Sequence, residues 1–204
     1  MADASERRAA GVAADVWGPS LWQLLHTIGF KATAETVPHA VRLLRELQYI
    51  IPCKVCRKGY QTFYVQHPPL SAECDPEVLA RWLWQCHDVV NQKLEKPYKA
   101  YCDIKKRYDA FHSQTSDTAV LDFLVLSSLN ASDSGAKHIA AFAQNVACSL
   151  SHILPPDFCE LLARPMDATS SKTVRESILK LHTEYHTARG IPCNARHHAA
   201  IVTE

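Results

Sequence analysis

The sequence has few glycines, no long apolar run and almost no net charge. Only 6 of the 204 residues are glycine, and alternating β-branched residues are hard to find, which disfavours a β-rich fold. Lysine and arginine total 22 and aspartate and glutamate total 21, so the net charge of +1 gives no electrostatic reason to expect nucleic acid as a partner. No segment approaches the roughly 18 consecutive apolar residues of a membrane span, so we expect no membrane insertion.

Residues 1–14 lack the apolar core of a secretory signal peptide, and we expect them to be a flexible N-terminus. Acidic residues at Asp3 and Glu6 also disfavour a mitochondrial presequence. The 8 cysteines are therefore unusual, because disulfides are rare in the reducing cytosol. Cysteine patterns in that compartment are more often catalytic or metal-binding.

Apolar periodicity predicts an all-α protein. The apolar stripe within residues 20–29 repeats at i, i+3, i+4 and i+7, as expected for one face of a helix. Further helices are predicted over residues 38–51, 75–94, 105–111, 119–129, 136–154 and 173–188. The polar stretch 113–118 divides the chain, so we expect one domain over residues 15–112 and a helical region over residues 113–204.

Cys53 and Cys56 form the CxxC motif that carries the main chemical signal. At a helix N-terminus the backbone N–H groups and the helix dipole lower a cysteine pKa and favour the nucleophilic thiolate. One alternative is half of a structural zinc site, but zinc needs two more ligands at short spacing, and no second CxxC or HxxxH-like pair lies close to this motif in the sequence. Another alternative is a thioredoxin-like site, which needs strands around the motif, whereas the flanks here are helical in pattern.

Two other segments flank the CxxC at a distance. Trp17-Gly18-Pro19-Ser20-Leu21-Trp22 leads to His26, which lies four residues after Trp22 and so shares its helix face. In the second segment, His87, Asn91 and Leu94 share a face and are followed by Lys96-Pro97. Each segment alone fits ordinary core packing.

Taken together in this order and at these separations, the three motifs resemble the Erv/ALR sulfhydryl oxidases over residues 17–111. The resemblance implies a four-helix bundle with a short fifth helix that holds FAD. It also implies that Cys53 and Cys56 are catalytic, that protein dithiols are oxidised to disulfides, and that electrons pass through FAD to O2 with release of hydrogen peroxide. No metal is expected.

The same resemblance assigns the residues that bind the cofactor. Aromatic and polar side chains from the first and fourth bundle helices would contact the flavin, the adenine and the ribose, and Lys96 would lie near the phosphates. The full set is Trp17, Pro19, Ser20, Trp22, His26, Tyr49, Cys56, His87, Val90, Asn91, Leu94, Lys96 and Tyr108.

The sequence departs from the family in its other cysteines. A second, shuttling cysteine pair is missing, so either substrates reach Cys53 directly or one of Cys148, Cys159 and Cys193 serves. The positions of a common structural disulfide are Tyr64 and Trp84 here. Pairing among Cys74, Cys86 and Cys102 could replace that bond, and the sequence does not fix the connectivity.

The short oxidase domain with an unrelated helical extension is most similar to the oxidases of large DNA viruses. We therefore expect a homodimer in the host cytoplasm or the virion, with the mitochondrial intermembrane space as a lesser alternative. The repeat of Ile51-Pro52-Cys53 at Ile191-Pro192-Cys193 suggests that residues 113–204 are a degenerate copy or a dimerisation module. Competing interpretations are a zinc-stabilised interaction module and an inactive flavin-binding scaffold.

Overall fold

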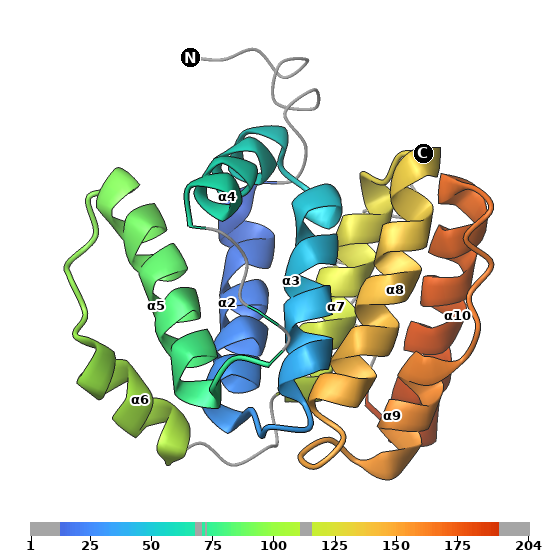
Figure 1. Cartoon of the computed structure of the whole chain (residues 1–204). Coiled ribbons are helices and arrows are strands. Elements are labelled where there is room, and N and C mark those ends of the chain that lie inside the picture. Colours follow the sequence, from blue (N-terminus) through green and yellow to red (C-terminus); the bar gives the residue numbers. More distant parts are fainter. Residues whose placement is uncertain (1–12, 68–70, 72, 111–115, 192–204) are drawn as a thin grey trace.

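The computed structural model describes residues 13–67, 71, 73–110 and 116–191, and within them it contains nine helices and no strand (Figure 1). The prediction of an all-α protein is therefore confirmed. The helices are α2 (Ala14–Lys31), α3 (Val37–Ile50), α4 (Lys54–Gln66), α5 (Pro76–Lys93), α6 (Tyr101–Asp109), α7 (Ser116–Leu129), α8 (Asp133–Ser149), α9 (Pro156–Ala163) and α10 (Ser171–Ala188).

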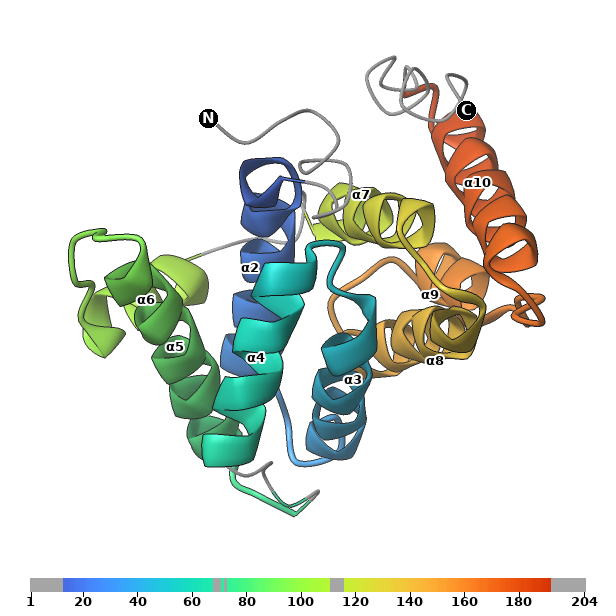
Figure 2. The ribbon, with the colours of Figure 1, turned by 90° about the horizontal axis from the view of Figure 1, so that it is seen from above.

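Helix α2 lies in the middle of the molecule. It packs against α5 and α6 on one side and against α7 on the other, while α3 packs against α8 (Figures 1 and 2). The chain is thus divided between a group formed by α2–α6 and a group formed by α7–α10, joined along α2 and α3.

Local sequence signals explain several helix starts. The Asp75 carboxylate accepts a hydrogen bond from the Glu77 backbone N–H at 2.7 Å, and Pro76 occupies the first helical position of α5. Ser170 and Thr173 form a reciprocal capping box at the start of α10.

In the second half of the chain the predicted helix boundaries differ from the observed ones, and one helix was missed. The helix expected over 136–154 begins at Asp133, because Ser132 caps it, and ends at Ser149. Helix α9 was not predicted, and Pro156 stands at the first position of this short helix, where proline is tolerated.

Gly29 sets the distance between α2 and α5. A Cβ atom on Gly29 would lie 2.8 Å from Leu83 Cδ1 and 3.3 Å from the backbone Cα of Ala80. The absence of a side chain therefore lets the two helices approach closely, which brings the side chains one turn away on each helix into contact.

One continuous core crosses from the first helical group to the second. Trp17 of α2 packs against Phe123 of α7, with ring centroids 6.5 Å apart, and Phe123 packs against Phe142 of α8 at 5.4 Å. At the other contact, His138 of α8 stacks on Tyr49 of α3 at 3.9 Å. The predicted domain boundary near residue 113 falls in a segment outside the described residues, so the boundary stays a prediction.

None of the described helices is long and apolar enough to cross a membrane.

Candidate redox and cofactor site

Cys53 and Cys56 form a disulfide at the start of α4. Cys53 is the N-cap residue, and its Sγ accepts a hydrogen bond from the Cys56 backbone N–H at 3.2 Å. Both cysteines are partly buried against the core. The Arg57 guanidinium donates to the carbonyl of Ile51 at 3.2 Å, which ties the turn before the disulfide to the first turn of α4. The disulfide therefore lies at the positive end of a helix on a fixed turn.

Every charged residue of α4 is basic. Its sequence contains Lys54, Arg57 and Lys58 and no acidic residue. Lys54 and Lys58 are exposed, and neither forms an ion pair with another described residue. Positive charge beside a sulfur atom stabilises its thiolate form, so this end of α4 favours thiol–disulfide exchange.

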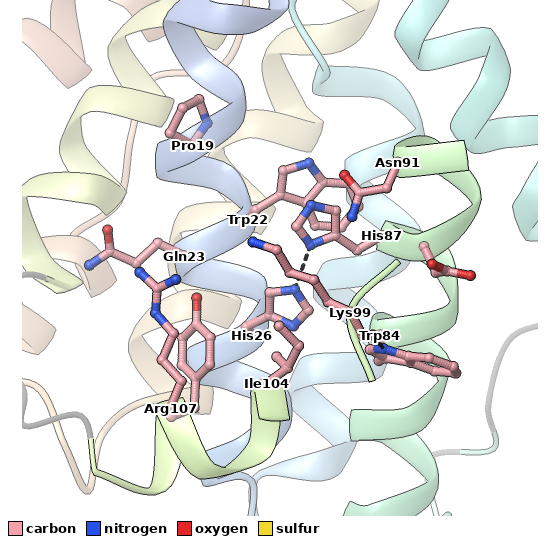
Figure 3. Close-up of a pocket in the computed structure, with 12 residues that line it drawn as sticks. Pro19, Trp22, Gln23, His26, Trp84, His87, Asn91, Lys99, Ile104 and Arg107 are labelled. Carbon is pink, nitrogen blue, oxygen red and sulfur yellow. Dashed lines mark hydrogen bonds between the residues drawn. The ribbon is translucent and has the colours of Figure 1, made fainter. Parts of the chain in front are cut away.

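A cavity of about 390 Å³ lies between α2, α5 and α6 (Figure 3). Six of its lining residues were predicted as cofactor contacts: Pro19, Trp22, His26, His87, Asn91 and Tyr108. Six others were not: Gln23, Trp84, Asp88, Lys99, Ile104 and Arg107. Five of the twelve lining side chains carry aromatic rings and two are basic, a combination that suits a flat aromatic ligand carrying negative charge.

A pair of histidines joins α2 to α5 inside this cavity. His26 Nε2 and His87 Nδ1 are hydrogen-bonded at 2.7 Å (Figure 3). Trp22, one turn before His26, stacks on the His87 ring with centroids 3.9 Å apart and an interplanar angle of 2°. The helical spacing of Trp22 and His26 therefore presents both rings to the same residue of α5.

Burial keeps both histidine rings neutral. It lowers the pKa of His26 to about 3, helped by the neighbouring His87 and Arg107. Burial also lowers the pKa of His87 to about 4, helped by the positive charges of Lys99 and Lys96. His26 Nδ1 is buried and has no hydrogen-bond partner among the described residues. A buried polar atom in this state is expected to meet a ligand or water.

The remaining predicted site residues do not line the cavity. Trp17 is buried against Phe123, and Tyr49, which is 47% exposed, stacks on His138. Leu94 and Lys96 are exposed, Ser20 and Val90 are partly buried, and Cys56 lies at the start of α4. Their assignment as cofactor contacts stays a prediction.

Helical spacing offered a signal for some of the residues that the sequence analysis missed. Trp84 precedes His87 by three residues, so it shares the face of α5 that carries His87 and Asn91. Lys99 lies outside any helix, between α5 and α6, and no periodic pattern points to it.

The disulfide pairings suggested for Cys74, Cys86 and Cys102 were wrong, since all three are free thiols. Cys86 is buried in the core and Cys102 is exposed. At the positions of the missing family disulfide, Tyr64 packs edge-on against Trp82 at 6.1 Å, and the Trp84 indole N–H donates to the Lys99 carbonyl at 2.9 Å.

The other expected cysteine roles remain open. Cys148 and Cys159 are free thiols, and Cys193 lies outside the described residues. The described part of the chain brings together no group of three or more metal-ligating side chains. The zinc alternative therefore has no ligand set in that part, where Cys53 and Cys56 are already bonded to each other.

Comparison with known proteins gives a family match for part of the chain. Residues 19–109 match the Erv1 / Alr family model. Over this segment, which is less than half of its length, the chain is similar to the Erv1/Alr family. No solved structure matches it significantly.

The curated relatives that this chain matches are sulfhydryl oxidases by name. The FAD-linked sulfhydryl oxidase ERV1 of Oryza sativa subsp. japonica is 33% identical over 96 residues, which cover 45% of this chain and 48% of the relative. The mitochondrial FAD-linked sulfhydryl oxidase ERV1 of Saccharomyces cerevisiae is 30% identical over 84 residues, or 39% and 43%. The FAD-linked sulfhydryl oxidase of African swine fever virus is 26% identical over 116 residues, or 53% and 92%. The chain thus spans about half the length of the first two relatives.

Proposed function

We propose that this protein is an FAD-linked thiol oxidase that converts protein dithiols to disulfides. The observation that carries the proposal is the Cys53–Cys56 disulfide, held at a helix N-terminus of a unit that also contains an aromatic cavity with a basic edge. Neither feature alone would decide the function. A redox disulfide needs an electron acceptor, and a flavin-sized cavity in the same helical unit can hold one.

The residues of the cavity fit FAD. Trp22 and the neutral His87 ring form a flat stacked wall, and His26 Nδ1 offers a buried polar atom without a partner among the described residues. Lys99 and Arg107 line the same cavity and could meet the two phosphates of the cofactor. Asn91, on the face of α5 that carries His87, supplies an amide for the ribose or adenine.

The chemistry of the cysteine pair begins with a substrate thiolate. The thiolate attacks Cys53 Sγ, forms a mixed disulfide and releases Cys56 as a thiolate, which the N-terminus of α4 and the charge of Arg57 stabilise. The second substrate thiolate then attacks the substrate sulfur of the mixed disulfide and releases Cys53. The substrate loses two electrons and two protons, and the cysteine pair gains the two electrons. When bound, FAD accepts these electrons from the pair and passes them to O2, giving hydrogen peroxide.

The visible spectrum of the purified protein tests this function. We expect a flavin band at about 450 nm that bleaches when dithiothreitol is added and recovers in air as peroxide accumulates. Cys53→Ser and Cys56→Ser should each abolish peroxide formation, and Cys102→Ser is the matched control because Cys102 is an exposed free thiol. A colourless protein, or a Cys56→Ser variant with full activity, contradicts the proposal.

The resemblance also leads us to propose the cellular setting. Protein dithiols are the substrates and O2 the acceptor, and the similarity to the viral relative favours the host cytoplasm or the virion over the mitochondrial intermembrane space. A homodimer is the assembly that the resemblance predicts. In this chain, however, α7 and α8 already cover sides of α2 and α3, and that coverage favours a monomer over the homodimer.

A further inference from the structure

We propose that α7–α10 are a second copy of α2–α5 that has lost its redox disulfide and occupies the place of a partner subunit. The copy is folded onto the first unit within one chain. The repeat runs in a different register from the one suggested by the sequence, which paired residues 51–53 with residues 191–193. Four observations, from helix packing, a loop, a helix face and a helix end, support the new register.

The packing of the two units is that of a two-fold pair. In an isologous contact each element meets its own counterpart, so a first helix packs on a first helix and a second on a second. Here α2 packs on α7 and α3 packs on α8, and the α3–α8 contact is the largest between the two groups (Figure 2). His138 near the start of α8 meets Glu46 and Tyr49 near the end of α3, so this helix pair is antiparallel, as a two-fold axis across it requires.

The loop before the third helix repeats in sequence. The segment from Ile50 to Cys56 reads IIPCKVC, and the segment from Ile153 to Cys159 reads ILPPDFC. Both join the second helix of a unit to its third. The same offset of 103 residues places buried core positions of α3 on buried core positions of α8: Leu43, Leu44 and Leu47 fall on Val146, Ala147 and Leu150.

The fourth helices match in length and in the positions of their polar residues. Helices α5 and α10 both contain 18 residues. His87 lies eleven residues after the start of α5, and His182 lies eleven residues after the start of α10. Asn91 and His186 then fall four residues later in each helix. Pro97 and Pro192 follow at the same distance in the sequence.

The two helices also end in the same way. Glu95 has a φ of 52° and Gly190 a φ of 61°, each two residues beyond the last helical residue. The Lys96 backbone N–H donates to the Asn91 carbonyl at 2.9 Å, and the Ile191 N–H donates to the His186 carbonyl at 3.0 Å. Such an end is common when the left-handed residue is glycine. Glutamate rarely adopts this left-handed conformation. Its occurrence at Glu95, the position that matches Gly190, therefore supports a common origin of the two helices.

The second copy has lost the chemistry of the first. Pro156 stands where Cys53 stands, so Cys159 has no cysteine at CxxC spacing before it. His186 stands at the position that matches Asn91. Its buried ring stacks on the buried ring of His182, with centroids 4.2 Å apart. The copy keeps only its packing role, which is to cover α2 and α3. One chain therefore contains one redox disulfide and both halves of a two-fold pair, and we expect a monomer.

The mass of the full-length protein in solution tests the assembly. We expect 22.8 kDa by light scattering over a range of roughly 1 to 100 µM protein, because the surface that a second chain would take is already covered. A stable dimer over this range overturns the inference that the second copy replaces a partner. It leaves the oxidase proposal untouched, because that proposal is measured by flavin reduction.

A restored cysteine pair tests the repeat independently of assembly. Pro156→Cys places a cysteine three residues before Cys159 at the start of α9, where the first copy has Cys53 and Cys56 at the start of α4. We expect the new pair to form a disulfide in air, seen as the loss of two thiols in peptide mass mapping. Asp157→Cys is the matched control, because its spacing of two residues differs from that of the first copy. Equal oxidation of both variants, or of neither, contradicts the register of the repeat.

Discussion

His26 and His87 are 61 residues apart in the sequence, yet their ring nitrogens share a hydrogen bond of 2.7 Å across the α2–α5 contact. Protonating either ring there would cost hydration because both are buried, and the positive charges of Lys96, Lys99 and Arg107 add to this cost, although Asp88 opposes it at His87. The pair therefore couples the geometry of the cavity to the protonation state of the protein.

Stability should fall as the pH falls below 6.5. The folded-state pKa values are about 3 for His26 and about 4 for His87, whereas an unfolded histidine has a pKa of about 6.5. Between these values the unfolded chain binds more protons than the folded chain, so the contribution is complete above pH 6.5 and is lost on acidification. We expect the free energy of unfolding to drop by on the order of 1 to 3 kcal/mol per pH unit between pH 6 and 5.

Chemical denaturation at several pH values measures this slope. A His26→Gln variant, which keeps a polar side chain but has no titrating ring, should show a shallower dependence over the same range. An identical slope in the variant means that other groups cause the acid sensitivity.

Gly29→Ala should destabilise the protein. The added Cβ would lie 2.8 Å from Leu83 Cδ1 and 3.3 Å from the Ala80 backbone, and Leu83 is fully buried, so the helices must separate. Overpacking typically costs about 1 to 3 kcal/mol, against a gain of up to about 1 kcal/mol from helix propensity. We expect a lower midpoint of thermal unfolding. Gly59→Ala in α4 is the control, because nothing lies within 4 Å of its added Cβ, and it should be neutral or stabilising.

Phe123→Ala should cost about 3 to 5 kcal/mol of stability, as expected for a fully buried phenylalanine. Its ring packs against Trp17 of α2 and Phe142 of α8, so the cavity that it leaves lies between the two helical groups. Val65→Ala, at a side chain that is 77% exposed, should change the unfolding free energy by less than about 0.5 kcal/mol. Similar values for the two variants would mean that the contact between the groups contributes little.

Lys99→Gln and Arg107→Gln should weaken cofactor binding without affecting the disulfide. Both side chains line the cavity beside His26 and His87, and each charge-assisted contact to a phosphate is worth about 1.5 to 3 kcal/mol, which corresponds to roughly 10- to 100-fold in affinity. Fluorescence titration of the flavin-free protein measures the dissociation constant for FAD. Lys172→Gln, on the exposed surface of α10, is the control. Unchanged affinity in both cavity variants removes these two residues from the phosphate site.

The sequence by itself determined most of the helices and the reactive motif. Apolar spacing marks the faces of α2, α3 and α5, and Asp75-Pro76 marks a helix start, because these signals act within one or two turns of the chain. Cys53 and Cys56 stand three residues apart, so their pairing is also a local property. The three motifs, spread over residues 17–97, were enough to indicate the family.

Only the tertiary structure decided which distant residues meet. Lys99 enters the cavity from an irregular segment, and Tyr49 stacks on His138 of α8, which lies far away in the sequence. The helix ends at Glu95 and Gly190, which reveal the repeat, have no common sequence pattern, because a left-handed backbone conformation is set by the packing around it as well as by the residue itself. Contacts between residues far apart in the chain depend on how the helices pack together, and periodicity within one helix contains no information about its neighbour.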